Sequence, residues 1–432
     1  MSIFKPGDTI KSLSGAPIRI VKFLNDGGQG EVYQVEYKGQ KKALKWYFPD
    51  SIRNPRLFIN NLLHEVIEKP SPDKAFLWPE ALTSNTRGSF GYIMDLVPDG
   101  YYTLEKVLAT TEHRFSSYKI AVEACLKILS AFRILHNRGY SYQDLNFGNF
   151  FVNPSTGDVL IGDNDNVAPN NTPTGILGTP RFMAPEVVTG KHLPNTASDR
   201  FSLSVIIFFV LMLGHPLEGN RWTIGCLTDE HAEWLYGKAP LFIFDPKDKG
   251  NAPDKQKQKG VIEMWSLIPD YLKQAFMHAF SQDLLFHPDR RMIEVEWMEI
   301  LARLKNEIFF CSCGNNVFLR DNKSKSTCEC CGKVIKIQNS IQLPHYAMPA
   351  IGGSEILRCQ LGTCDPNIAL TRVARLIADE KQPDMVVFQN LTPNILPAKT
   401  PRGADARVNP NDMVPIRPGI SVKLFDKTIQ FM

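Results

Sequence analysis

The hydrophobic pattern of the chain changes its period partway along, and this change constrains the fold more than any other feature. Three short runs between residues 18 and 47 read as β-strands, since one is apolar and β-branched and another alternates: IRIVKFL, EVYQVEY and KKALKWY. From Tyr118 onward the spacing is helical, with long stretches at 118–136, 198–214, 269–282 and 293–307. The pattern predicts an α+β chain in which a β-rich lobe precedes a helix-rich lobe, with a cleft between them.

Shorter elements complete this outline. Residues 56–68 have helical spacing that Pro70 and Pro72 stop, and two strand-like pieces follow at 76–82 and 91–97. Beyond residue 340, strand candidates such as MVVFQNL, SVKLF and KTIQF lie between turn residues. We therefore expect three domains, at 1–308, 309–338 and 339–432, the first divided into lobes at about 15–97 and 98–308.

Bulk properties exclude several classes of protein. A length of 432 residues exceeds the size at which single cores stop growing, and a net charge of +4 is too weak to indicate nucleic acid. The N-terminus has no apolar stretch of signal-peptide length. The longest apolar run, Phe201 to Leu213, is shorter than the roughly 20 residues that a membrane span requires. We expect a cytoplasmic protein with no membrane or nucleic-acid partner.

The first chemical signal is a glycine-rich turn followed by a lysine. Leu24 to Val32 (LNDGGQGEV) lies between two predicted strands, and such glycines let backbone amides approach phosphates. Lys45 follows Gly30 by fifteen residues on the third strand, where it would supply a positive charge for phosphate oxygens. A plain turn and an exposed strand lysine are the alternatives for each feature alone.

The second signal is a set of acids and an amide. Asp144 is followed five residues later by Asn149, after a predicted helix, so both side chains can reach one phosphate-transfer point. Asp163 follows the apolar strand 159–161, and its carboxylate is a hard oxygen ligand suited to Mg²⁺. Each acid alone could be a loop cap, but the combination favours phosphoryl transfer.

These motifs resemble the protein kinase family, in particular bacterial serine/threonine kinases, over roughly residues 15–305. The resemblance implies a bilobal kinase fold that uses ATP and Mg²⁺. Lys45 would grip the phosphates, Glu65 would pair with Lys45 (Glu68 being a less well-spaced rival), and Asn149 and Asp163 would hold the metal. Asp144 would orient the substrate hydroxyl.

The resemblance also implies a nucleotide site and a substrate platform. The glycine loop would cover the phosphates, Met94 would be the gatekeeper, and the whole nucleotide set would be Leu24, Gly27, Gly28, Gly30, Val32, Ala43, Lys45, Met94, Asp95, Val97 and Phe151. The segment from Gly178 to Glu186 is close to the end of a serine/threonine kinase activation loop. Arg291 fits the arginine that pairs with Glu186, and Asp199 opens the buried helix.

Several positions depart from the family pattern. Tyr142-Gln143 replace the usual His-Arg, which puts activation by loop phosphorylation in doubt. Asn146 replaces a lysine that steadies the transferring phosphate, leaving Thr179 and the metal ions to compensate. Asn164 and Asp165 follow Asp163 in place of Phe-Gly, and Asp165 either caps the loop, which we favour, or adds to the metal environment.

The sequence therefore leaves three functions open. The favoured one is ATP-dependent phosphorylation of protein serine or threonine, in bacterial signalling or a stress response, because Lys45, Glu65, Asp144, Asn149 and Asp163 are all present. The altered motifs leave room for a pseudokinase scaffold that binds nucleotide and recruits partners. A small-molecule kinase is disfavoured by the segment 178–186.

Four cysteines downstream predict a structural zinc site. Cys311, Cys313, Cys328 and Cys331 form two glycine-ended turns separated by 14 residues, with Cys330 as a spare. Four thiolates leave no open coordination position, so a catalytic zinc is disfavoured. This segment, 309–338, is expected to be a zinc ribbon that could hardly fold without metal.

The C-terminal part resembles a forkhead-associated β-sandwich in a few places, notably residues 388–392 and 427–431. Its pattern lacks the arginine, serine and histidine with which such domains read phosphothreonine, so we expect an interaction or structural domain. Kinases of this arrangement are often encoded beside a PP2C-type phosphatase, and the resemblance implies such a partner.

Overall fold

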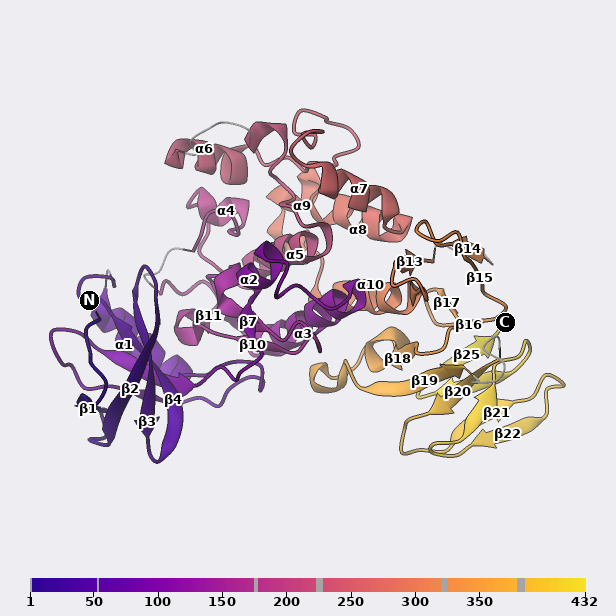
Figure 1. Cartoon of the computed structure of the whole chain (residues 1–432), viewed down its shortest axis with the longest axis horizontal. Helices are drawn as coiled ribbons and strands as arrows, with labels where there is room; N and C mark the ends of the chain where they lie inside the picture. The colour runs from indigo at the N-terminus through magenta and orange to yellow at the C-terminus, as the bar shows by residue number, and fades with distance from the viewer. Residues whose placement is uncertain (1, 53, 175–177, 223–227, 320–324, 379–384) are drawn as a thin grey trace.

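Six antiparallel strands form the sheet at the N-terminal end of the computed structural model (Figure 1), which describes all residues except 1, 53, 175–177, 223–227, 320–324 and 379–384. In sheet order they are β1 (Thr9–Lys11), β2 (Pro17–Asp26), β3 (Gly30–Tyr37), β4 (Gln40–Tyr47), β6 (Gly91–Asp95) and β5 (Ala81–Leu82). The β3–β4 hairpin turns at Lys38 and Gly39, whose φ angles of 49° and 74° suit a tight primed turn. The strands predicted between 18 and 47 are confirmed.

The sheet buries both of its faces. On the outer face, the N-terminal segment places Phe4 against Tyr33 and Trp46 in edge-to-face contacts. On the inner face, Ala43, Tyr47 and their neighbours join the main core of the molecule. This double burial holds β3 and β4 firmly at the cleft.

The helix predicted at 56–68 lies against the sheet but changes type halfway. α1 (Pro55–Asn61) begins at Asn54, whose side chain accepts from the Leu57 amide, with proline at the first helical position. It continues into a π-helical segment, Leu62–Ile67. π-Helical turns are rare and frequently mark functional sites.

The helical lobe follows. Its helices are α2 (Leu104–Ala109), α3 (Tyr118–Asn137), α4 (Pro185–Val188), α5 (Thr196–Met212), α6 (Asp229–Glu233), α7 (Lys259–Leu267), α8 (Asp270–Ala279), α9 (Gln282–Phe286) and α10 (Glu294–Glu307). α5 carries the long apolar run and is buried within the lobe. Across the described residues, no helix combines the length and apolarity needed to cross a bilayer.

Short strands of the helical lobe lie beside the region that we call the cleft, where Asp163 and Asp165 of that lobe contact Lys45 of β4. They are β7 (Tyr102–Thr103), β8 (Tyr140–Ser141), β9 (Phe150–Val152), β10 (Val159–Ile161) and β11 (Ala168–Pro169). β9 pairs with both β10 and β7, and β8 pairs with β11. These pairings bring the segments around 144, 149 and 163 to one edge of the helical lobe.

Two small hairpins make up the cysteine segment, residues 309–338. Their strands are β12 (Ile308–Phe310), β13 (Asn316–Phe318), β14 (Lys325–Thr327) and β15 (Val334–Lys336). Their core is small, since it consists of Cys311, Val317, Leu319, Cys328 and Ile335.

The tail domain, residues 339–432, consists of two sheets that share a core. One has the order β17 (Ala347–Pro349), β16 (Ser340–Gln342), β25 (Lys427–Phe431), β24 (Ser421–Leu424), β21 (Leu396–Lys399) and β22 (Asp405–Val408). The other has the order β18 (Glu355–Leu357), β19 (Arg372–Ala378), β20 (Val386–Asn390) and β23 (Met413–Pro415). Two sheets around one core agree with the β-rich C-terminal domain that we expect, and its forkhead-associated-like type stays a prediction.

The tail domain packs on the helical lobe, on the side away from the N-terminal sheet (Figure 1). Lys305 on α10 lies between Glu123 of α3 and Glu355 of β18, with Nζ–Oε2 distances of 2.8 and 2.9 Å. Leu357 and Cys359 belong to the core of the helical lobe. The hydrophobic core therefore crosses the domain boundaries that we predict at 308 and 338, and those boundaries stay predictions.

Candidate functional site: a charged cleft between the lobes

Cross-strand register places the predicted nucleotide residues on one face of the sheet. Val32 pairs with Lys45, which pairs in turn with Tyr92, and Ala43 pairs with Met94. Directly opposed residues share a face, and Ala43 and Lys45 are two residues apart on one strand. The inner face thus presents an apolar patch beside a lysine.

The glycine loop leads into this face. A side chain at Gly30 would collide with the Trp46 carbonyl oxygen, so β3 can approach β4 here only with glycine. Gly27 and Gly28 have open space around them, and the Gly27 amide donates to the Gly30 carbonyl over 2.9 Å. Leu24, just before the loop, is exposed.

The other predicted nucleotide residues line the same region. The side chain of Asp95, at the end of β6, points to Lys42, with an Nζ–Oδ1 distance of 2.8 Å. Its side chain is therefore engaged, and the predicted nucleotide contact at this position falls to its backbone. Val97 is half-buried beyond it. Phe151 of β9 comes from the helical lobe, and its ring packs so closely against Gly162 that a Cβ there would lie 2.9 Å away.

Lys45 is the centre of the charged part of the cleft. It is only 5% exposed, and its Nζ lies 3.2 Å from Asp163 Oδ2 and 3.0 Å from Asp165 Oδ2. Burial alone lowers the pKa of a lysine, but the two carboxylates outweigh it and raise the pKa of Lys45. The ammonium is therefore held charged inside the protein.

The predicted ion pair between Lys45 and Glu65 is wrong, because the Glu65 carboxylate has other partners. Glu65 lies in the π-helical segment, and its Oε2 accepts from Tyr140 Oη at 2.9 Å and lies 3.3 Å from Lys69 Nζ. The rival Glu68 pairs with His64. Asp165, and neither glutamate, lies against Lys45.

The segment Asp163–Asn166 is polar, and its last three side chains are buried. Asp163 has a left-handed backbone, with φ 47° and ψ 42°, of the kind that clusters at functional sites. Asn164 is buried, and its amide donates to the Leu77 and Ile161 carbonyls at 2.9 and 2.8 Å. The loop-capping role favoured for Asp165 is also wrong, since the hydroxyl of Tyr47 and the ammonium of Lys45 both donate to its carboxylate.

Asp144 and Asn149 lie together across the cleft. The Asn149 side-chain amide donates to the Asp144 carbonyl over 2.9 Å, which leaves its own carbonyl oxygen for another partner. The Thr179 amide donates to Asp144 Oδ1 over 3.3 Å. Burial, with a smaller contribution from the charge of Asp163, raises the pKa of Asp144, although Asn146 and Thr179 lower it in part.

The neighbours of Asp144 connect its loop to the segment 172–174. Gln143 has a positive φ of 71°, donates to the Thr172 carbonyl over 3.0 Å and accepts from Thr174 Oγ1 over 3.1 Å. Gln143 thus holds the segment 172–174 through neutral hydrogen bonds, where the family pattern has an arginine. Asn146 Oδ1 caps the next turn by accepting from the Gly148 amide.

Buried charged side chains hold the loop that carries Asp144. Asp199 accepts from the Tyr142 amide over 2.7 Å and from His136 Nε2 over 3.1 Å. The other nitrogen, Nδ1, of His136 lies 2.8 Å from Glu294. Burial alone lowers the pKa of His136, but these two acids raise it to about 9.

The pair expected between Glu186 and Arg291 is present as two parallel hydrogen bonds of 2.7 Å each. Both side chains are buried, and the fork geometry makes this a strong charge-assisted contact. It ties the end of the segment 178–186 to the turn after α9. The segment 178–186 is therefore anchored at its end.

The four predicted cysteines converge. The Sγ atoms of Cys311, Cys313, Cys328 and Cys331 all lie within 4.8 Å of one another, and Cys330 is an exposed spare. Gly314 and Gly332 close the two turns with φ angles of 86° and 72°. This donor set fits a tetrahedral ion that prefers sulfur, such as Zn²⁺.

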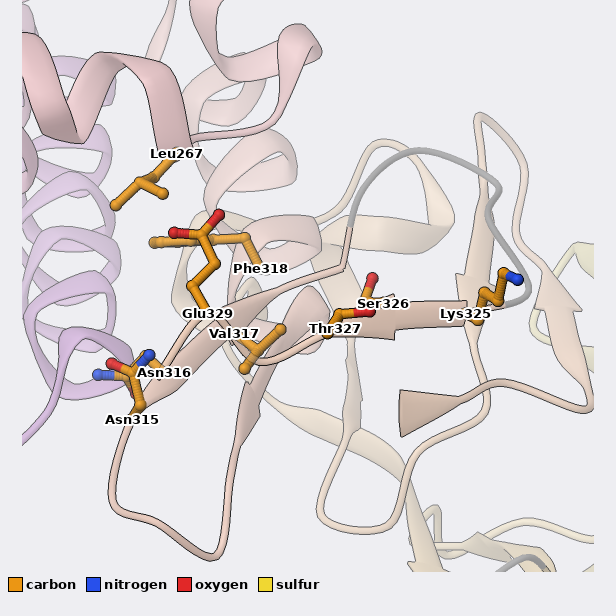
Figure 2. A pocket seen from close by; sticks show the side chains of 9 residues that line it. All are labelled: Leu267, Asn315, Asn316, Val317, Phe318, Lys325, Ser326, Thr327 and Glu329. Carbon is orange, nitrogen blue, oxygen red and sulfur yellow. The ribbon is translucent and has the colours of Figure 1, made fainter. Parts of the chain in front are cut away.

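A separate pocket of about 450 Å³ lies where the cysteine segment meets the helical lobe. Figure 2 shows Leu267, at the end of α7, near Phe318 and Glu329 at one end of the pocket, while Lys325 lies apart at the other. Phe318 also makes an edge-to-face contact with Tyr118. The pocket is distant from the acids of the cleft and belongs to the junction of the two units.

Sequence reasoning missed two contributions to the site. The anchoring of Lys45 by Asp165 and Tyr47 depends on burial that no local pattern signals. The Gln143 contacts could have been suspected only from its place beside Asp144.

Comparison with known proteins shows a protein kinase domain. A family model described as protein kinase domain matches residues 19–240, more than half of the chain. The protein kinase C delta type of Rattus norvegicus is 24% identical over 209 residues, which are 46% of this chain and 30% of that protein. The probable serine/threonine-protein kinase WNK10 of Arabidopsis thaliana is 30% identical over 137 residues, or 31% of this chain and 25% of that protein.

The cell cycle serine/threonine-protein kinase CDC5/MSD2 of Saccharomyces cerevisiae is 30% identical over 204 residues, or 45% of this chain and 27% of that protein. The chain thus spans well under half the length of these curated relatives. Among solved structures, the kinase domain of Mycobacterium tuberculosis PknI aligns with a TM-score of 0.46 at 16% identity, covering 69% of this chain and 97% of that one.

Proposed function

Because the chain belongs to the protein kinase family, we propose that it transfers the γ-phosphoryl group of ATP to serine or threonine hydroxyls of protein substrates. One observation carries this proposal: Lys45, Asp163 and the Asp144–Asn149 pair, from distant parts of the sequence, meet at one cleft. Phosphoryl transfer requires mostly positioning and neutralisation of charge, and these groups supply both.

The nucleotide would lie under the glycine loop. Gly27, Gly28 and Gly30 carry the backbone amides that face its phosphates, and Lys45 holds the phosphate oxygens. The base would rest between Leu24, Val32, Ala43, Met94 and Phe151, with the backbone of Asp95 and Val97 at its edge. Asp163 and Asn149 are the oxygen ligands for Mg²⁺, which when bound neutralises the charge of the phosphates.

Asp144 is the proposed general base, and it orients the substrate hydroxyl for in-line attack. Its raised pKa makes it a better proton acceptor than an ordinary aspartate. The Thr179 amide fixes the carboxylate, while Asn146 supplies no positive charge at the position where the family pattern has lysine. The transferring phosphate therefore depends on Lys45 and the metal for neutralisation.

The segment 178–186 supports protein serine or threonine as the acceptor. It is anchored at Glu186 by Arg291, and its start contacts Asp144 through Thr179, so a peptide lying on it would reach the base.

A phosphotransfer assay tests the proposal and its alternatives. Purified protein with Mg²⁺ and radiolabelled ATP should label itself or a generic protein substrate on serine or threonine, and Asp144→Asn and Lys45→Met should abolish the label. Binding of ATP without transfer by the parent would favour the pseudokinase scaffold. Label on a metabolite pool and on no protein would favour a small-molecule kinase.

The four-cysteine cluster is proposed as a structural Zn²⁺ site of a zinc ribbon. All four ligands come from the protein, so no coordination position is left for chemistry. Reduced thiolates and ATP are both available in the cytoplasm, where we place the protein.

The tail domain is proposed as an interaction or structural module of forkhead-associated-like shape. The bacterial signalling or stress-response setting and the PP2C-type phosphatase partner rest on the resemblance in domain arrangement alone. We propose no nucleic-acid or membrane partner. Detection of phosphate removal from the labelled protein by such a phosphatase would test the partnership.

A further inference from the structure

Lys45 needs a fixed acid to stay charged and oriented inside the protein. In the described part of the chain its ion pairs are with Asp163 and Asp165. Glu65, the acid expected from the resemblance, is engaged with Tyr140 and Lys69 instead. One of the two aspartates must therefore provide the anchor.

The two aspartates differ in exposure. The Asp163 side chain is 36% exposed, whereas the Asp165 side chain is fully buried. A partly exposed carboxylate can reach a metal ion in the cleft. A fully buried one is better placed to hold a neighbouring side chain.

Asp165 is itself fixed by the strand that carries Lys45. Tyr47 lies two residues after Lys45, on the same face of β4, and its hydroxyl donates to the same Asp165 oxygen that Lys45 contacts. Burial and the charge of Asp165 raise the pKa of Tyr47 well above the usual value, so the hydroxyl keeps its proton and remains a donor. Tyr47, Asp165 and Lys45 form one buried hydrogen-bonded chain.

We infer that Asp165 is the positioning residue for Lys45, in the place of Glu65, and that Tyr47 supports it. Asp163 then remains free to hold the metal. The inference rests on the proposed function, because it assigns how the phosphate-binding lysine of that site is oriented. It also explains how the helix that carries Glu65 can be π-helical and turned away without loss of the lysine's partner.

Two other roles for Asp165 are open to test. Its Oδ1 is buried and accepts no hydrogen bond within the described structure, so it could be a metal ligand. It could also hold Lys45 away from phosphates, as an autoinhibitory latch. Each role predicts a different response to Asp165→Asn.

The first measurement is the affinity for a fluorescent N-methylanthraniloyl-ATP, with and without Mg²⁺. Asp165→Asn should weaken binding roughly 10- to 100-fold under both conditions, because a charge-assisted contact to the lysine is lost. Tyr47→Phe, which is nearly isosteric, should weaken it by a smaller factor of about 3. Glu65→Gln should change it less than about 3-fold.

The second measurement needs no nucleotide. Asp165→Asn removes the carboxylate that lies 3.0 Å from Lys45 Nζ and releases the ammonium from that buried ion pair, so acetylation of Lys45, followed by mass spectrometry, should be about 10-fold faster than in the parent. Glu65→Gln should leave that rate unchanged. Circular dichroism and thermal melting show whether each variant folds. If Asp165→Asn does not fold, the same measurements are made on Tyr47→Phe, which removes only one hydroxyl that donates to Asp165.

The outcomes separate the roles. An effect of Glu65→Gln equal to that of Asp165→Asn would overturn the inference. If Asp165→Asn raised the Mg²⁺ concentration needed for half-saturation but left metal-free nucleotide binding unchanged, Asp165 would be a metal ligand and the inference would be wrong. If Asp165→Asn bound the nucleotide more tightly, Asp165 would be an autoinhibitory latch, which would also overturn the inference. A parent that transfers no phosphate would defeat the proposed kinase activity, but the acetylation rates would still decide the role of Asp165.

Discussion

The cleft and the cysteine segment both gather ionisable side chains, but they do so by different means. In the cleft, Lys45, Asp144 and Asp163 are distant in sequence and are brought together by a large hydrophobic core that exists without them. In the cysteine segment, two short turns bring the thiols together around a core of five buried residues. The comparison indicates that charge removal in the cleft should cost function, while metal removal from the cysteine segment should cost structure.

The largest expected effect is metal removal. Structural zinc sites contribute apparent binding free energies of about 10–16 kcal/mol, so a strong chelator should unfold residues 309–338 and abolish their amide protection in hydrogen exchange. Metal analysis of the parent should give one zinc per chain. Cys313→Ser should lower this ratio sharply, and Cys330→Ser, the matched control, should not.

If the cysteine segment kept its amide protection after chelation, its small core would be enough to keep it folded without metal. The proposed difference between the cleft and the cysteine segment would then be wrong. The cleft should keep its own protection in the same experiment, since its core does not depend on the thiols.

The next effect is functional. Asp144→Asn preserves volume and removes the general base, so kcat should fall about 10²- to 10⁴-fold with little change in melting temperature. The raised pKa of Asp144 adds a pH signature: activity should be present at neutral pH and lost as pH falls, starting at a higher pH than for an ordinary aspartate. Steady-state kinetics across pH checks both. An unfolded Asp144→Asn protein would show that the cleft, too, depends on its charges for structure.

Beneath the cleft, the charge of His136 stabilises the folded protein, because His136 lies between Asp199 and Glu294. Its pKa is raised from 6.5 to about 9, so its contribution is fully present below pH 6.5 and is lost as pH rises through 9. The shift corresponds to at most roughly 3 kcal/mol. Urea unfolding at pH 6.5 and 9.5 should show this loss in the parent, and His136→Gln should remove most of it. Parallel pH dependences in the two proteins would contradict the assignment.

The smallest effect lies at the junction of the two regions. The edge-to-face contact between Phe318 and Tyr118 has a centroid distance of 5.1 Å, and such pairs contribute about 0.5–1.5 kcal/mol. Phe318→Leu should lower the opening free energy of the cysteine segment by about that amount, measured by hydrogen exchange. It should leave kcat unchanged. A change in kcat would show that the junction communicates with the cleft.

Much of this organisation could be predicted from sequence, because it depends on local patterns. The strands between 18 and 47 and the long helices follow from their periods, and the thiols of Cys311, Cys313, Cys328 and Cys331 meet as their spacing indicates. The strand expected at 76–82 shortens to Ala81–Leu82, after Pro79, which lacks an amide for a sheet ladder.

The missed parts depend on tertiary placement. Glu65 lies in a π-helical segment that the helical spacing does not signal, and its carboxylate contacts Lys69 and Tyr140 instead of Lys45. The sequence gives no sign that Asp165 is fully buried, since that burial arises from β4 and the segment 163–166 packing together. Long-range electrostatic pairing is the least predictable part of the site.

A crystal structure with Mg²⁺ and a non-hydrolysable ATP analogue would test the proposed site directly. We expect one Mg²⁺ held by the Asp163 carboxylate and the Asn149 side-chain oxygen, with Lys45 in contact with a phosphate while still paired with Asp165. A nucleotide bound elsewhere, or a cleft in which Lys45 and Asp163 do not reach the phosphates and the metal, would contradict it.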